Sequence, residues 1–189
     1  MTQISLICYF PSSVGTGRKA DAHTVILSGM TIAVIGSFSQ HFKQVKEAIH
    51  AFIERGHSVL SPISYEILLP GIPFIRFATD RPDLSDSQVQ SVALHRILQA
   101  NLVYVVDPGG YVGRTTCYEI GRIVQAKRPI FFQEEPSDLP LEIPSGNVVA
   151  AQDLALLLSR REVAVRPLYV DDPNYQLESD LLKGYYRNL

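Results

Sequence analysis

The sequence has few cysteines and no tryptophan. Its 189 residues include two cysteines, Cys8 and Cys117, which fit neither a metal-binding spacing nor a disulfide framework. We therefore expect a reducing compartment, a cytoplasmic location and no metal site. At Cys117 a packing role is favoured over a nucleophilic one, because the sequence places no base beside it.

A large charge excess and a long apolar run are also missing. The chain has 17 Lys and Arg against 19 Asp and Glu, a net charge of −2. Without a basic excess it lacks the electrostatic footprint of a protein that binds a nucleic-acid polymer. No apolar run reaches the length of a membrane span, and the first residues lack a secretion-signal pattern. These features predict a small-molecule partner and no membrane.

Short buried strands alternating with helices are what the sequence does contain. Continuous apolar runs at 31–36, 58–61, 102–106 and 129–132 predict strands, and apolar residues at helical spacing lie between them. At 46% hydrophobic residues, the chain can form one substantial core. We expect an α/β fold with a doubly wound, Rossmann-like or flavodoxin-like parallel sheet in three α/β/α layers.

The expected organisation has three parts. Residues 1–29 form an N-terminal extension with an accessory strand at 4–10, residues 30–160 form the α/β domain, and residues 161–189 form a tail that packs on a neighbouring subunit. Inside the domain, the proline-containing segment 62–85 predicts a long loop that contributes substrate contacts.

The glycine-containing turn after the third predicted strand is the most informative segment. The buried strand 102–106 is followed by Asp107, a turn with three glycines, and a helix that carries Glu119. Ligands of parallel sheets bind beyond the carboxyl ends of the strands, and a helix N-terminus there offers unpaired N–H groups. The turn has neither the spacing of a dinucleotide fingerprint nor the lysine of a phosphate loop.

The motif in this turn resembles a known enzyme family. The residues from Gly110 to Gly121 read Gly-Tyr-Val-Gly-Arg-Thr-Thr-Cys-Tyr-Glu-Ile-Gly and follow a strand that ends in Asp. They look like the nucleoside 2-deoxyribosyltransferase-like superfamily, and the likeness covers about residues 31 to 133. It implies cleavage of the N-glycosidic bond of a nucleoside or its 5′-monophosphate, by hydrolysis or base exchange, with no cofactor and in a homo-oligomer. Glu119 would attack the anomeric carbon.

The resemblance also implies which residues bind the substrate. They lie in the loop after the first strand and in the glycine turn: Gly36, Ser37, Phe38, Ser39, Gly109, Gly110, Tyr111, Gly113, Arg114, Thr115 and Thr116.

The chain departs from the family at the second acid. Many members carry an acidic residue on the helix before the catalytic strand, where this chain has Gln88, Gln90 and His95. His95 and Asp107 are the candidate proton donors, since histidine as a residue type serves as an acid or base in enzymes. For both, a structural interpretation stays open: His95 as a packing residue, and Asp107 as the start of the turn.

Alternative interpretations of the motif also stay open. Thr116-x-x-Glu119 has the spacing of a capping box, in which both side chains bond the start of a helix. Ser39 is also a candidate N-cap of the first helix.

A non-catalytic nucleotide-binding or sensing domain is the alternative function. The Pro108-Gly109-Gly110 turn also resembles, more weakly, that of cytokinin-activating phosphoribohydrolases.

Overall fold

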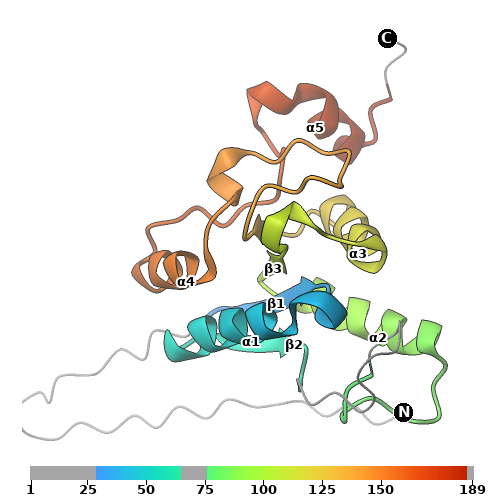
Figure 1. Ribbon diagram of the computed structural model, residues 1–189. Coiled ribbons are helices and arrows are strands. Elements are labelled where there is room, and N and C mark those ends of the chain that lie inside the picture. The colour runs from blue at the N-terminus through green and yellow to red at the C-terminus, as the bar shows by residue number, and fades with distance from the viewer. Residues whose placement is uncertain (1–28, 65–75, 187–189) are drawn as a thin grey trace, which may run out of the picture.

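The computed structural model describes residues 29–64 and 76–186 (Figure 1). The accessory strand expected at residues 4–10 and the central part of the predicted loop 62–85 lie outside these ranges. Within the described residues, no helix is long and apolar enough to cross a membrane.

A four-stranded, all-parallel sheet forms the centre of the molecule. Its strands are β1 (Thr31–Gly36), β2 (Ser58–Ser61), β3 (Leu102–Val106) and β4 (Ile130–Phe132), in the order β2-β1-β3-β4. β1 and β3 pair along their length, from Ile32 beside Leu102 to Gly36 beside Val106. All four predicted strands are confirmed.

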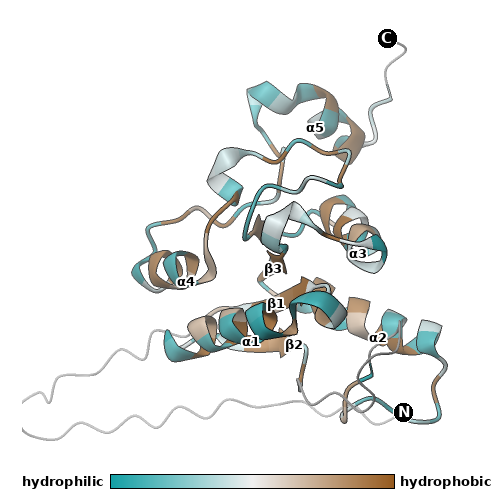
Figure 2. Ribbon diagram, viewed as in Figure 1, coloured by the Kyte–Doolittle hydropathy of each residue, from teal (hydrophilic) through white to brown (hydrophobic). Residues whose placement is uncertain are grey.

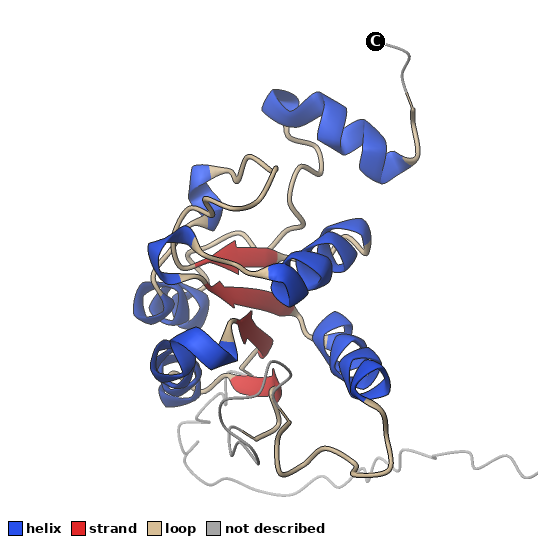
Figure 3. Cartoon of the chain, turned by 45° about the vertical axis from the view of Figure 1, so that its right-hand side comes forward, coloured by secondary structure: helices blue, strands red, loops and turns tan. Residues whose placement is uncertain are grey.

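Helices cover both faces of the sheet. α1 (Phe38–Glu54) and α4 (Ala151–Arg160) form one layer, and α2 (Asp86–Gln99) and α3 (Arg114–Gln125) form the other. Figure 3 shows the strands between these two layers, and Figure 2 shows apolar and polar bands alternating along the helices. The predicted three-layer α/β/α fold is therefore confirmed.

Each strand contributes alternate residues to two separate cores, as its period of two requires. Ile32, Val34 and Tyr104 pack with α1 and α4, whereas Ala33 and Val105 pack with α2 and α3. Because both faces of the sheet are buried, β3 is apolar at every position, which is why it was recognisable in the sequence.

The chain after α4 packs on the domain's own cores. Val163 and Val165 lie against the α1/α4 core, and Leu168 and Leu182 belong to the α2/α3 core. The last helix, α5 (Gln176–Lys183), lies at the end of the molecule opposite β2 (Figure 1). Leu181, Tyr185 and Tyr186 near the end of the tail are each more than half exposed, so contact of the tail with a neighbouring subunit stays a prediction.

The strand order reverses direction between β1 and β3. From β1 the chain passes through α1 to β2 on one side, whereas β3 lies on the other side of β1. The loops that leave β1 and β3 therefore separate at the carboxyl edge of the sheet, where open α/β sheets bind their ligands.

Candidate active site

A cavity of about 250 Å³ lies at this divergence of β1 and β3. Its walls come from the ends of β1 and β2, the start of α1, one face of α2 and the start of α3. It brings together ten of the fourteen residues predicted for the site: Gly36, Ser37, Phe38, Ser39, Tyr111, Gly113, Arg114, Thr115, Thr116 and Glu119.

Glu119 is the buried carboxylate of this cavity. Its residue is 8% exposed, and its Oε1 accepts a hydrogen bond of 2.7 Å from Nε2 of Gln90 on α2. Burial disfavours the charged form and raises the pKa of Glu119 to about 7, while the bond from Gln90 acts in the opposite direction. The carboxylate is therefore held in place and is near half ionisation at neutral pH.

The capping-box interpretation of Glu119 is wrong. The N-cap of α3 is Gly113, so Thr116 lies inside the helix and no side chain caps its start. A true capping box forms instead at α2, where Ser85 and Gln88 each bond the other's backbone N–H. Glu119 is thus free of a capping role, and its bond to Gln90 joins α3 to α2.

The loop from β1 to α1 depends on a glycine. Gly36 has φ of +150°, and a Cβ there would lie 2.4 Å from the carbonyl oxygen of Val106. This close approach lets the chain leave β1 beside β3 and enter the cavity wall. Ser37 is the N-cap position of α1, without a side-chain capping bond, so the expectation of Ser39 as the cap is wrong. The hydroxyls of Ser37 and Ser39 lie 3.3 Å apart.

Asp107 and the first two glycines of the turn lie outside the cavity lining. Asp107 is fully buried, and its Oδ1 accepts from the N–H groups of Gln133 and Glu134, after β4. Its burial raises the pKa of Asp107 to about 7, and its Oδ2 has no partner among the described residues. Asp107 therefore ties the turn to the segment after β4.

The glycine turn is held by that same segment. The N–H of Gly109 donates to Glu134, and the carbonyl of Gly110 accepts from the N–H and the hydroxyl of Ser137. A Cβ at Gly110 would lie 2.6 Å from the carbonyl oxygen of Glu135. Gly109 and Gly110 thus shape the turn rather than line the cavity.

The N–H groups just before α3 and in its first turn divide into two sets. The N–H groups of Val112 and Gly113 donate to the carboxylate of Asp138, at 2.9 and 3.1 Å. Those of Arg114, Thr115 and Thr116 have no acceptor in the described part of the chain. All three of these residues line the cavity, which therefore adjoins the N-terminal, partly positive end of α3.

One further candidate, His95, is not brought to the cavity. His95 lies on an exposed position of α2 and does not contribute to the lining, whereas Gln90, Ala93 and Ile97 of that helix do. The cavity therefore faces the side of α2 away from His95.

Cys117 packs at the edge of the α2/α3 core, and burial raises the pKa of its thiol. Both observations agree with the packing role expected for Cys117.

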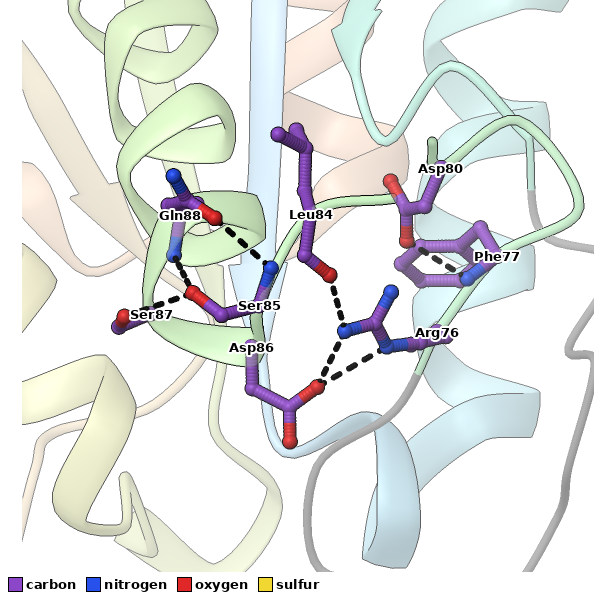
Figure 4. Close-up of polar contacts among 8 residues, drawn as sticks. All are labelled: Arg76, Phe77, Asp80, Leu84, Ser85, Asp86, Ser87 and Gln88. Carbon is purple, nitrogen blue, oxygen red and sulfur yellow. Dashed lines mark hydrogen bonds and ion pairs between the residues drawn. The ribbon is translucent and has the colours of Figure 1, made fainter. Parts of the chain in front are cut away.

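The loop before α2 supplies an aromatic side chain to the cavity. Phe77 packs edge to face on Phe38, with ring centroids 5.2 Å apart, and both residues line the cavity. Figure 4 shows how this loop is held: Arg76 donates to Asp86 and to the carbonyl of Leu84, while the N–H of Phe77 donates to Asp80.

Several lining residues were not predicted individually: Gln40, Ser61, Pro62, Phe77, Val89, Gln90, Ala93 and Ile97. Pro62 and Phe77 fall in the loop for which substrate contacts were expected. Gln90, Ala93 and Ile97 recur at helical spacing, which marks one face of α2 but not which element that face meets. The resemblance pointed to Gln88, Gln90 and His95 as the residues in place of the second acid, but only the structure shows that Gln90 is the one bonded to Glu119.

Comparisons of the chain with protein-family models, with curated proteins and with solved structures found no match.

Proposed function

We propose that the protein cleaves the N-glycosidic bond of a nucleoside or nucleoside 5′-monophosphate, with Glu119 as the nucleophile. The observation that carries this proposal is the buried Glu119 carboxylate, bonded to Gln90, in a cavity beyond the ends of β1 and β3. The resemblance of the glycine turn to the deoxyribosyltransferase-like superfamily supports the same reaction.

The chemistry requires an anion beside the anomeric carbon. Glycosidic cleavage passes through an oxocarbenium-like state, which a carboxylate stabilises and then traps as an ester. The bond from Gln90 occupies one oxygen of Glu119 and leaves the other available for attack. Water, or a second base, then takes the sugar and releases the carboxylate.

The start of α3 fits the other end of the substrate. Arg114 and Glu119 are five residues apart on α3, about 7.5 Å of helix rise, and both line the cavity. The Arg114 guanidinium and the unpaired N–H groups of the first turn suit a 5′-phosphate.

A second candidate function is nucleotide binding without turnover. One observation favours it: among the described lining residues Glu119 is the carboxyl group, and Asp107 and His95 lie outside the lining. A domain with this cavity would bind a ligand and leave it intact.

The deciding experiment separates these functions. The protein is incubated with nucleosides and their 5′-monophosphates, with and without an acceptor base, and the products are separated chromatographically beside a Glu119→Gln control. Free base from the wild type alone supports hydrolysis, and a new nucleoside formed with acceptor supports transfer. Unchanged ligands that bind in calorimetry would favour the sensing domain.

We also propose a cytoplasmic, homo-oligomeric protein, from the cysteine content and the family resemblance. Light scattering on the purified chain tests the assembly: a monomer mass at working concentration would contradict it.

A further inference from the structure

We propose that the preferred substrate is an N-glycoside of a cationic heteroaromatic base, that is, a pyridinium nucleoside or its 5′-monophosphate. This inference rests on the proposed function, since it names the leaving group that the Glu119 cavity releases best. It draws on three features of the cavity: the placement of its carboxyl group, the partner of that group, and its aromatic wall.

The leaving group of a neutral nucleoside needs a proton. When the bond between C1′ and the ring nitrogen breaks, both electrons go to the nitrogen, and a neutral base would depart as an anion unless an acid protonates it. Apart from hydroxyl groups, which are weak acids, the described lining holds one proton-bearing acid, the carboxyl group of Glu119, and it is already used in attack on C1′. Its neighbour Gln90 is an amide, which donates a hydrogen bond but transfers no proton.

A pyridinium base removes this requirement. The two electrons of the C1′–N bond neutralise the positive charge of the ring, so the base leaves as a neutral molecule without a proton. Glu119 forms the ester with C1′, and water then attacks C1′. The products are the free sugar, the neutral base and one proton, which passes to Glu119 or to solvent. One carboxylate is sufficient for each step.

The cavity walls also suit a planar cation. Phe38 and Phe77 present an edge-to-face aromatic pair, Tyr111 adds a third ring, and Val89, Ala93 and Ile97 of α2 add an apolar surface. Aromatic rings attract cations through the negative potential of their faces, and the Glu119 carboxylate adds an opposite charge. Arg114, the cation of the described lining, lies at the exposed start of α3, where the substrate's phosphate would offset it.

Charge recognition is tested first by binding, without turnover. Calorimetry compares 1-methylnicotinamide, which carries the pyridinium charge, with nicotinamide, which has the same ring without it. We expect the charged ring to bind at least about tenfold more tightly, as one cation–π contact with partial desolvation would give. Equal binding, or tighter binding of nicotinamide, would overturn the charge argument.

Cleavage is then measured on one panel: nicotinamide mononucleotide and nicotinamide riboside against AMP, GMP, CMP and UMP, with Glu119→Gln as the blank for spontaneous hydrolysis. We expect kcat/KM to be about 100-fold or more higher for the pyridinium compounds, the size of a missing general-acid contribution. Neutral nucleotides cleaved equally well would overturn this inference and leave the proposed N-glycosidase standing. No cleavage of any compound would instead refute the proposed function itself.

Discussion

At the scale of single residues, Glu119 is set apart by its burial. Its ordinary carboxyl pKa is raised to about 7 because water is excluded from the charged form, and one hydrogen bond from Gln90 offsets only part of this effect. The same residue is therefore central to the proposed reaction and unfavourable to folding when ionised. Both consequences are measurable.

The first prediction concerns the pH dependence of cleavage. Glu119 must be ionised to attack, so kcat/KM on nicotinamide mononucleotide should rise with pH through about 7 and then level off. A pyridinium leaving group needs no acid, so no descending limb is expected up to pH 9. A bell-shaped profile would indicate an essential acid and contradict the single-carboxylate mechanism.

The second prediction concerns stability in Glu119→Gln. Because the folded-state pKa lies above the ordinary value, the folded state binds more protons between these values, and wild-type stability falls as pH rises from about 4.5 to 7. Glutamine keeps an oxygen that accepts from Gln90 and carries no charge. At about 1.4 kcal/mol per pH unit, the variant should be more stable by up to about 3 kcal/mol at pH 8.

Urea unfolding of both proteins at pH 4.5 and pH 8 measures this difference. The contribution of Asp107, whose pKa is also raised, is common to both proteins and cancels in the comparison. An equal difference between the proteins at the two pH values would show that Glu119 is not buried as described.

A third prediction adds the acid that the α2 face lacks. Ala93 lines the cavity one helical turn after Gln90, and Ala93→Asp places a carboxyl group near that of Glu119. Two nearby carboxyls do not both ionise, so the pair should keep one shared proton near neutrality, which can pass to a neutral base while the other carboxyl attacks. Cleavage of AMP should rise by about tenfold or more. Ala93→Asn is the matched control, and an equal rise in both variants would exclude proton donation.

At the scale of elements, the loop from Arg76 to Ser85 is held by α2 rather than by a regular structure of its own. Arg76 is mostly buried and bonds Asp86, the first residue of α2, and the carbonyl of Leu84 (Figure 4). These bonds keep Phe77 against Phe38. The aromatic wall of the cavity therefore depends on the start of α2.

The fourth prediction tests this dependence with Arg76→Met. The variant keeps the apolar part of the side chain but loses the guanidinium N–H groups that donate to Asp86 and Leu84. The loop is then held less firmly, so Phe77 should leave its place against Phe38 more often. We expect KM for the pyridinium substrate to rise several-fold with a smaller change in kcat, because the hydrogen bonds of Arg76 go to Asp86 and Leu84 and leave the bond between Gln90 and Glu119 in place. Steady-state kinetics beside Arg81→Met provides the control, since Arg81 is exposed and its ion-pair partner among the described residues is Asp83. A fall in kcat alone would refute the role assigned to Arg76.

Helices and strands could be predicted from the sequence where the spacing of apolar residues fitted only one of the two. The buried strand Leu102–Val106 and the amphipathic helices α1 and α3 follow directly from their patterns. The start of α3 was less clear, because Thr116 and Glu119 match a capping box as well as a catalytic motif. The position of Gly113 at the helix start, bonded to Asp138 of the segment after β4, excludes the capping box.

At the scale of the whole molecule, the chain after α4 completes the fold. Val163, Leu168 and Leu182 cover surfaces that would otherwise be open to water. The fifth prediction follows: a chain ended after Arg160 exposes several apolar side chains, each worth about 1.5–3 kcal/mol, and should lose its cooperative thermal transition. Circular dichroism melting measures this.

The matched control is the full chain with Tyr185→Ser and Tyr186→Ser. These side chains are strongly exposed, so each substitution should change the unfolding free energy by less than about 0.5 kcal/mol. A cooperative transition in the truncated chain would mean that residues 30–160 fold alone.

The sequence by itself determined the class of fold and the motif that carries Glu119. Both depend on local patterns: apolar periodicity shows which faces are buried, and the glycine turn shows where the chain reverses beyond a strand. Tertiary structure alone decided which residues share the cavity. Gln90 and Glu119 lie 29 positions apart and meet because α2 and α3 pack on the same face of the sheet. Asp107 and His95 lie outside the cavity lining, and this too depends on how the elements pack. Contacts between elements produce no repeating pattern in the sequence, so they could not be predicted from it.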